Sequence, residues 1–254
     1  MNIIITAGGT SEKIDNKRKI VNIDSGKYGA LLAAALCDLD NVEKIMYVSP
    51  QKSIKPKKND KIVFYDIESV KDVCNTIEDI LSSNSVEYIV HTMSVGDHML
   101  EYVASTEKIA LELACMSSAE SANNQMLVKV IKDTITQLET PHDIINEKNE
   151  EEMKNTDLII RMVPSPNIPA LIKEKSPDTK IIGYMNANET KHEDMIDNVS
   201  NEFDKNSYES IIVENIVDGA PKENYAFVMH GDRTVKEVKN RQGSIDFIKE
   251  KIKN

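Results

Sequence analysis

Short, uninterrupted apolar runs recur along this chain and alternate with stretches of helical periodicity. Residues 2–6, 44–48 and 87–91 have the composition of strands that are buried on both faces. Residues 26–39 and 69–81 carry apolar side chains at helical spacing. This alternation predicts an α/β fold, namely a Rossmann-like, doubly wound and mainly parallel sheet.

The alternation is interrupted once and then resumes. Residues 104–155 predict a helical insertion or cap, with helices at 107–116 and 119–137, inside a single α/β domain that spans residues 1–254. Beyond it we expect further strands at 157–162, 179–184 and 210–214, and helices at 167–175 and 189–205. A C-terminal β-hairpin around Gly231-Asp232 and a helix at 244–253 complete the predicted fold.

Composition narrows the possible functions. The net charge of −11 argues against a nucleic-acid-binding surface, which needs a basic face, although one local cluster of cations can still hold a small nucleotide. The three cysteines are widely spaced and odd in number, as expected of thiols in a reducing cytoplasm. A strand begins within two residues of Met1, and no apolar run approaches membrane-spanning length, so we expect neither a signal peptide nor a membrane partner.

Two loops at the predicted carboxyl edge of the sheet suit an anion. Adjacent Gly8 and Gly9 let backbone amides approach a ligand closely, and Thr10 adds a hydroxyl group. The second loop opens the first helix, where Ser25, Gly26 and Lys27 combine free amides, the positive end of the helix dipole and a cation. Asp24 or Ser25 is available as the N-cap of that helix. Together the loops predict a phosphate site.

Two familiar nucleotide-binding signatures are absent. The glycines at 8 and 9 are adjacent, and the helix begins only near residue 26, so a dinucleotide-binding fingerprint is excluded. A P-loop is also absent, because Val21 stands where it needs glycine and Tyr28 where it needs Ser or Thr. The long connection 11–24, which carries Arg18 and Asn22, is typical of a functional or irregular loop.

Several segments resemble the phosphopantothenate–cysteine ligase family (phosphopantothenoylcysteine synthetases). The opening Ile-Thr-Ala-Gly-Gly-Thr-Ser-Glu-Lys-Ile-Asp (5–15), with Arg18, Ile20, Asn22 and Ser25-Gly26-Lys27-x-Gly29, is similar to that family's N-terminal motif. Further similar blocks follow in the same order at 90–98, 162–168, 182–184 and 212–215. The resemblance covers nearly the whole chain outside 104–155 and is closest to the stand-alone bacterial type.

The resemblance implies an activity in coenzyme A biosynthesis. The carboxylate of 4′-phosphopantothenate would attack the α-phosphate of CTP, giving an acyl-CMP intermediate and pyrophosphate, and the amine of L-cysteine would then displace CMP. ATP replaces CTP in eukaryotic relatives, and the sequence does not choose between them. The family also implies Mg²⁺, a cytoplasmic location and a homodimer formed near residues 92–98.

The resemblance also assigns roles to residues. Asn22 would hold the acyl-nucleotide carbonyl, Arg18 would act in the second half-reaction, and Asp97 would be the carboxylate near the metal. Lys148 is the nearest counterpart of a family lysine that contacts the triphosphate. The remaining predicted nucleotide contacts are Gly8, Gly9, Thr10, Ser25, Gly26, Lys27, Met93, Ser94, Tyr184 and Asn215.

Other interpretations stay open. Asn22 also suits a turn, Arg18 a solvated charge, Asp97 a helix N-cap and Tyr184 a core position. Asp24 stands where the family has serine, and Ile216 where it has aspartate. The alternative function is a non-catalytic nucleotide-binding or regulatory relative that kept the fold, whereas the missing fingerprint disfavours an NAD(P)-dependent oxidoreductase.

Overall fold

The computed structural model describes most of the chain in two compact units. The described residues are 1–106, 108–110, 113, 129, 131–134, 157–187, 192–215 and 225–253. The first unit, here called the sheet unit, contains Met1–Ser11, Val21–Gly96 and Pro166–Asn254, and the second, the ribbon unit, contains Glu12–Ile20 and Asp97–Ser165. Most of the predicted helical insertion at 104–155 lies outside the described residues, as does Lys148.

The sheet unit is built on eight strands whose order confirms the predicted fold class. The order is β12-β11-β10-β9-β6-β1-β4-β5. The six strands from β10 to β5 are parallel, while β11 and β12 form the predicted antiparallel hairpin. Their bounds are β1 Asn2–Thr6, β4 Lys44–Pro50, β5 Ile62–Ile67, β6 Tyr88–His91, β9 Lys180–Ala187, β10 Ser210–Asn215, β11 Tyr225–His230 and β12 Val235–Glu237.

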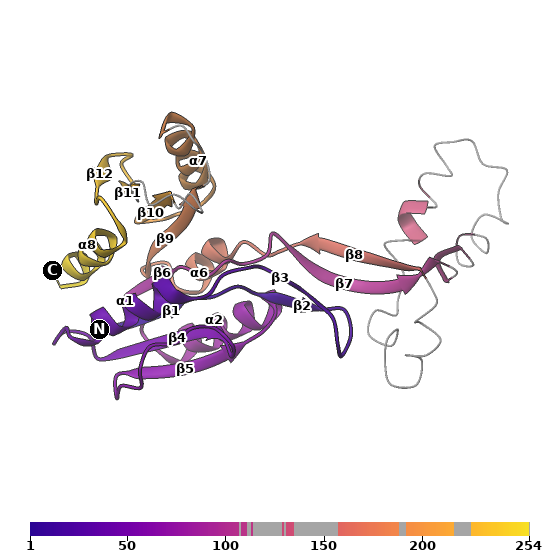
Figure 1. The fold of residues 1–254 in the computed structure, drawn as a ribbon, viewed down its shortest axis with the longest axis horizontal. Coiled ribbons are helices and arrows are strands. Elements are labelled where there is room, and N and C mark those ends of the chain that lie inside the picture. Colours follow the sequence, from indigo (N-terminus) through magenta and orange to yellow (C-terminus); the bar gives the residue numbers. More distant parts are fainter. Residues whose placement is uncertain are drawn as a thin grey trace. The chain divides into compact units, whose positions relative to one another are not determined.

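Helices connect these strands and cover the sheet (Figure 1). Their bounds are α1 Lys27–Cys37, α2 Val70–Ser83, α6 Ile168–Lys175, α7 His192–Lys205 and α8 Arg241–Lys253. Two begin as their sequences indicate: Ser69 and Asp72 form a reciprocal capping box at α2, and the Asn167 side chain accepts the Ala170 amide at α6. None of the described helices is long and apolar enough to cross a membrane.

Two apolar clusters hold the helices on the sheet. Ile3 and Ile5 of β1 pack with Leu32 of α1 and Ile248 of α8, and all four are almost fully buried. A second cluster joins α7 to β10 and β11 through Met195, Val199, Ile211, Val213, Phe227 and Met229. Because strand residues alternate between faces, Ile4 points away from the α1–α8 side. Both faces of β1 are therefore buried, as its uninterrupted apolar sequence predicts.

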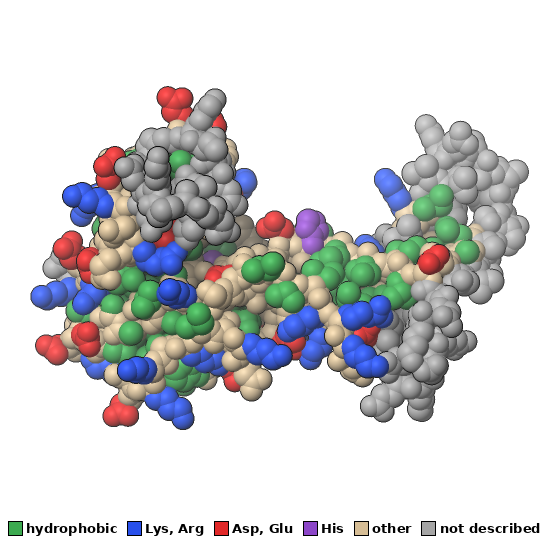
Figure 2. Space-filling view, in the orientation of Figure 1, with side chains coloured by type: hydrophobic (Ala, Val, Ile, Leu, Met, Phe, Trp, Pro, Cys, Tyr) green, Lys and Arg blue, Asp and Glu red, His purple; other side chains and the backbone are tan. Residues whose placement is uncertain are grey.

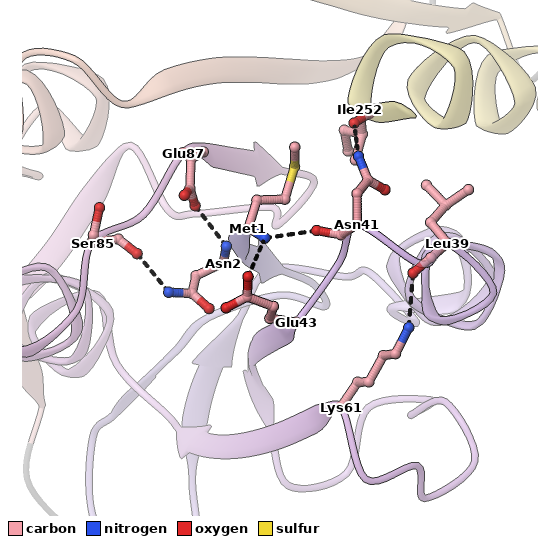
Figure 3. A network of polar contacts seen from close by, with 9 residues as sticks. All are labelled: Met1, Asn2, Leu39, Asn41, Glu43, Lys61, Ser85, Glu87 and Ile252. Carbon is pink, nitrogen blue, oxygen red and sulfur yellow. Dashed lines mark hydrogen bonds and ion pairs between the residues drawn. The ribbon is translucent and has the colours of Figure 1, made fainter. Parts of the chain in front are cut away.

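Polar contacts hold the amino end of β1 in place (Figure 3). The Met1 amino group donates to the Asn41 carbonyl at 2.7 Å, and the Asn2 amide donates to Glu87 Oε2 at 2.6 Å. The Asn41 side chain in turn donates to the carbonyl of Ile252 in α8. These bonds connect β1 with the segments that lead into both neighbouring strands and with the last helix, so the register of the central strand is fixed at its start.

The ribbon unit differs from the sequence prediction. β8 (Leu158–Pro164) pairs with β7 (His98–Ser105) as an antiparallel two-stranded sheet, so the predicted strand at 157–162 does not join the parallel sheet. Its side chains explain the difference, because Ile159 and Ile160 are 37% and 38% exposed instead of doubly buried. The long connection 11–24 contains a second small ladder, β2 (Ser11–Lys13) with β3 (Lys19–Val21).

Candidate functional site

A pocket lies within the sheet unit at the carboxyl ends of β6 and β9 and at the start of α1. Its volume is about 480 Å³. In open parallel sheets, ligands bind at this edge, where neighbouring crossover connections leave in opposite directions. The pocket is lined by Ile23, Asp24, Ser25, Gly26, Lys27, Tyr28, Gly29, Thr92, Met93, Ser94, Tyr184, Asn186 and Arg241. Six predicted nucleotide contacts are thus brought together: Ser25, Gly26, Lys27, Met93, Ser94 and Tyr184.

The start of α1 forms part of the wall of this pocket. Gly26 is the N-cap with φ of 76°, a left-handed conformation that favours glycine. The expectation that Asp24 or Ser25 would be the N-cap is therefore wrong. Asp24 Oδ1 instead accepts the Gly26 amide at 2.8 Å, which forms the turn before the helix. The helix N-terminus and exposed Lys27 offer amides and a positive charge to an anion.

The loop after β4 supports this helix start. The Ile54 amide donates to the Ser25 carbonyl at 2.9 Å, and the Tyr47 hydroxyl lies 3.4 Å from the Ile54 carbonyl. Ser53 packs so closely beneath Gly26 that a Cβ atom there would lie 3.2 Å from Ser53 Cβ. Sequence reasoning missed this support, because nothing in residues 51–54 indicates a partner near the start of the preceding helix.

The Gly8-Gly9-Thr10 loop does not line the pocket and instead joins strand ends. The Gly8 carbonyl accepts the Ser94 amide at 2.9 Å, and the Thr10 amide donates to the Ser94 carbonyl at 3.1 Å. A Cβ atom at Gly9 would lie 1.8 Å from the Asn22 carbonyl oxygen, so this glycine is required by the chain's own packing. The predicted contacts of Gly8, Gly9 and Thr10 with phosphate stay predictions.

Asn22 is held against this loop. Its backbone amide donates to the Thr10 carbonyl at 2.9 Å, and its side-chain Nδ2 donates to Thr10 Oγ1 at 3.0 Å. Thr10 Oγ1 also accepts the Gly96 amide. Asn22 does not line the pocket, but the next residue, Ile23, does. The Asn22 side-chain amide is therefore held in place by Thr10, next in sequence to a residue of the pocket wall. Its role at a reacting carbonyl stays a prediction.

Another part of the pocket wall is aromatic. The rings of Tyr28 and Tyr184 pack 4.4 Å apart at an interplanar angle of 30°. Burial raises the pKa of both phenols, so both are hydrogen-bond donors at neutral pH. The Tyr184 hydroxyl donates to Glu214 Oε2 at 3.1 Å, and Glu214 is only 4% exposed. Tyr184 thus belongs to the pocket wall and not to the interior alone.

Glu214 accepts hydrogen bonds from three residues: Tyr184 of β9, and Arg241 and Ser244 of α8. Arg241 places Nε and Nη2 at 3.0 and 2.9 Å from Oε2, and the Ser244 hydroxyl donates to Oε1 at 3.1 Å. Sequence reasoning missed Arg241, Tyr28 and Glu214. One signal was present, because a glutamate inside the apolar strand at 210–214 requires a buried partner. The partner lies 27 residues later, at the start of α8.

The remaining predicted residues lie elsewhere. Arg18 belongs to the ribbon unit, where it forms an ion pair with Asp15 at 2.6 Å and its side chain is 59% exposed. Asp97 precedes β7, so the alternative that it caps a helix is wrong. Asn215 ends β10. The predicted roles of these residues stay predictions, and Lys148 lies outside the described residues.

A metal ion can be accommodated only in part by protein groups. Among the described residues, no three His, Cys, Asp or Glu side chains converge on a common point. Mg²⁺ is normally held by phosphates, waters and one or two carboxylates, so a protein cage is unnecessary. Asp24 places one carboxylate at the pocket wall. Its Oδ1 already accepts the Gly26 amide, so Mg²⁺ at this pocket would be held mainly by phosphate oxygens of a ligand and by water.

His91 makes the strand-end region sensitive to acid. Its Nδ1 lies 2.8 Å from Thr6 Oγ1, and burial lowers its pKa to about 4. The unfolded chain binds a proton near pH 6.5 and the folded chain does not, so the free energy of unfolding falls as the pH drops below 6.5. We expect a loss of about 2 kcal/mol between pH 7 and pH 5 from this residue.

Urea titrations of the wild type and His91→Gln at pH 7 and pH 5 measure this effect. The glutamine variant should lose less stability over that interval, because it has no group to protonate. An identical loss in both proteins would contradict a His91 that stays neutral in the folded chain.

The fold and pocket together define a mainly parallel α/β protein with a ligand site at the carboxyl edge of its sheet. The profile of the DNA/pantothenate metabolism flavoprotein C-terminal domain matches residues 1–138, which is more than half of the chain. The chain belongs to this family, and the family resemblance seen in the sequence is confirmed. No curated protein matches the chain.

Solved structures have the same fold. A DNA/pantothenate metabolism flavoprotein from Streptococcus pneumoniae is 20% identical with a TM-score of 0.73, over 99% of this chain and 98% of that chain. The C-terminal domain of the coenzyme A biosynthesis bifunctional protein CoaBC is 16% identical with a TM-score of 0.61, over 99% and 94%. A Cab2 mutant in complex with phosphopantothenate-cysteine is 12% identical with a TM-score of 0.64, over 99% and 87%.

Proposed function

We propose that this chain is a phosphopantothenate–cysteine ligase that uses a nucleoside triphosphate, CTP in preference to ATP. The observation that carries the proposal is the pocket itself. It combines a helix start that carries Lys27 with the Tyr28–Tyr184 pair, so it offers both a phosphate-binding group and an aromatic surface for a base. The family membership, together with the phosphopantothenate-cysteine bound to the structurally similar Cab2 mutant, supports the substrates.

The proposed reaction has two steps. The carboxylate of 4′-phosphopantothenate attacks the α-phosphate of CTP, an acyl-phosphate bond forms and pyrophosphate leaves. The amine of L-cysteine then attacks the acyl carbonyl, an amide bond forms, and CMP leaves while the amine loses a proton. The charge on the departing pyrophosphate would be offset in part by Mg²⁺.

The residues of the chain would contribute binding and charge stabilisation. The first-turn amides of α1 and Lys27 would hold the phosphates, and Tyr184 would pack against the base. Asn22 would donate to the acyl carbonyl as negative charge develops on it, and Arg18 would act in the second step. We also propose cytoplasmic localisation, where the free thiols of Cys37 and Cys74 stay reduced.

The competing proposal is a non-catalytic nucleotide-binding relative, which the Asp24 carboxylate in the pocket wall favours. One experiment separates the two. The purified protein is mixed with phosphopantothenate, Mg²⁺ and CTP or ATP, and pyrophosphate is measured before and after cysteine is added. Pyrophosphate release followed by amide formation supports the ligase. Nucleotide binding without pyrophosphate release, with both nucleotides, would overturn it.

Asp24→Asn is expected to tighten triphosphate binding about threefold at low salt. The asparagine oxygen can still accept the Gly26 amide, so the turn is kept, while one negative charge near the phosphates is removed. Calorimetric titration with CTP and Mg²⁺ measures the change, and Asp232→Asn, at an exposed site in the hairpin, is the matched control. Weaker binding by Asp24→Asn would instead identify Asp24 as a metal ligand.

We further propose that the protein is a homodimer, with the ribbon unit contributing to the interface. Hydrophobic side chains are visible along the β7–β8 ribbon in Figure 2. Ile159 and Ile160 are more than one-third exposed there, and a two-stranded ribbon cannot bury both of its faces alone.

Ile160→Glu is expected to shift the protein from a dimer to a monomer of 28.5 kDa. Light scattering coupled to size-exclusion chromatography measures the mass. The matched control is Leu31→Glu, which places the same charge at an exposed apolar position on α1. A monomeric wild type would contradict the homodimer. If the glutamate at 160 left a dimer intact, the ribbon would not form its interface.

A further inference from the structure

The Glu214–Arg241 pair, which is bonded to Tyr184 of the pocket wall, has no role in the reaction as described above. Glu214 lies in β10 between buried Val213 and the strand end at Asn215. An isolated carboxylate at 4% exposure would be costly, and here it is fully surrounded by donors. Arg241 lines the pocket and Glu214 does not.

We propose that Arg241 is a specificity-determining residue that donates to a ring carbonyl oxygen of the nucleotide's base, and that Glu214 is a positioning residue that holds Arg241. This inference rests on the proposed function, because it assigns the base to the part of the pocket wall that Tyr184 forms. The ligand class that it selects is a nucleotide with a carbonyl on its base, such as cytosine or uracil. Adenine has no such oxygen.

Charge argues for a neutral acceptor. Two nitrogens of Arg241 face a single oxygen of Glu214, so the pair carries no net charge. Such a pair is a weak counter-ion for a polyphosphate, whereas Lys27 and the α1 N-terminus supply positive charge to the same pocket. A guanidinium has five N–H donors in a rigid plane, more than one carboxylate oxygen can accept. Arg241 is therefore suited to directional hydrogen bonding to a neutral group.

Geometry argues for the base. Glu214 Oε2 accepts both Arg241 and the Tyr184 hydroxyl, so the guanidinium and the phenol are fixed by the same atom. Tyr184 also packs on Tyr28, whose hydroxyl lies 3.0 Å from Ser244 Oγ, and Ser244 donates to the other oxygen of Glu214. The aromatic surface and the donor are thus one connected unit. A planar ring that packs against Tyr184 would lie beside a donor of fixed position.

The test compares nucleotides and variants of the full chain by calorimetry with CTP, UTP and ATP, each with Mg²⁺. The wild type should bind CTP and UTP more tightly than ATP. Arg241→Met should weaken the binding of CTP and of UTP about tenfold, which is the effect of one charged hydrogen bond. The affinity for ATP should change by less than about twofold. Arg241→Lys should lose most of the same preference, because an ammonium lacks the planar fork.

Removing one partner of a buried pair can unfold a protein, so a double variant accompanies the single ones. Glu214→Gln combined with Arg241→Met removes both charges, and the glutamine oxygen can still accept a hydroxyl hydrogen bond, so this variant should melt close to the wild type, yet it should also lack the base preference. Equal weakening of all three nucleotides by Arg241→Met would make Arg241 a phosphate ligand and overturn the proposal. If Arg241→Met lowered the melting temperature but left the ratio of the CTP and ATP affinities unchanged, the proposal would also be overturned, and the pair would be purely structural.

These outcomes are separate from those of the proposed function. A wild type that prefers CTP through Arg241 but releases no pyrophosphate would overturn the ligase and keep this inference. Conversely, the wild type could release pyrophosphate with both CTP and ATP while its preference between these nucleotides did not depend on Arg241. That result would keep the ligase and overturn this inference.

Discussion

Asn22→Asp is expected to lower the rate of amide formation at least about a hundredfold, the effect of losing one preorganised donor to a developing oxyanion. The carboxylate would face the acyl carbonyl with like charge where the amide donated a hydrogen. The fold should survive. Thr10 Oγ1 accepts the Gly96 amide, and its own hydrogen can rotate to donate to the new carboxylate. The measurement is the rate of product formation with cysteine, alongside a thermal melt.

Asn59→Asp is the matched control for this prediction. Asn59 is exposed, and its side-chain oxygen accepts the Lys61 amide, a role that aspartate keeps. The control introduces the same charge away from the pocket and should retain wild-type turnover. If Asn22→Asp also turned over at the wild-type rate, Asn22 would be only a turn residue held by Thr10.

Gly9→Ala is expected to destabilise the protein by about 3 kcal/mol, at the upper end of the cost of inserting one carbon atom into a packed region. The new Cβ would lie 1.8 Å from the carbonyl oxygen of Asn22 and 2.8 Å from its carbonyl carbon. Both are backbone atoms, so no side-chain rotation can relieve the overlap. Urea denaturation of the wild type and the variant measures the change in the free energy of unfolding.

Gly231→Ala provides the comparison, because a Cβ there would meet its nearest atom, the Tyr208 carbonyl oxygen, at an ordinary 3.5 Å. This variant should change the free energy of unfolding by less than about 1 kcal/mol. If the two variants had the same free energy of unfolding, Gly9 and Asn22 would not approach each other as described. A selective loss at Gly9 would explain why the glycine pair is needed even without a direct contact with the ligand.

The parallel sheet could be predicted because its strands are doubly buried. A run such as Ile3-Ile4-Ile5 needs apolar partners on both faces, and only a covered sheet supplies them. The ribbon unit gave no such signal. β7 contains His98 and Glu101 among its apolar residues, and β8 looks like a core strand because Ile159 and Ile160 are apolar although more than one-third exposed. Composition cannot separate a strand buried in a sheet from one that leaves its apolar residues uncovered.

The site was predictable where backbone geometry determines it. The rule that ligands bind at the carboxyl ends of parallel strands led to Ser25 and Lys27, whereas Ser94 was predicted from the family resemblance. Arg241 could not be found in this way, because it begins a helix that follows the antiparallel hairpin. Its place in the pocket depends on a long-range ion pair with Glu214, and pairing of that kind leaves no local pattern.

The bond between the Ile54 amide and the Ser25 carbonyl has a consequence for how this chain can vary in length. Surface loops commonly accept extra residues. The segment between Pro50 and Ile54 is tied at one end to β4 and at the other to the helix start that lines the pocket. An inserted residue there would push on Gly26 through Ser53, so a natural relative with a longer loop at this point would have to rebuild the start of α1 and with it this part of the pocket wall.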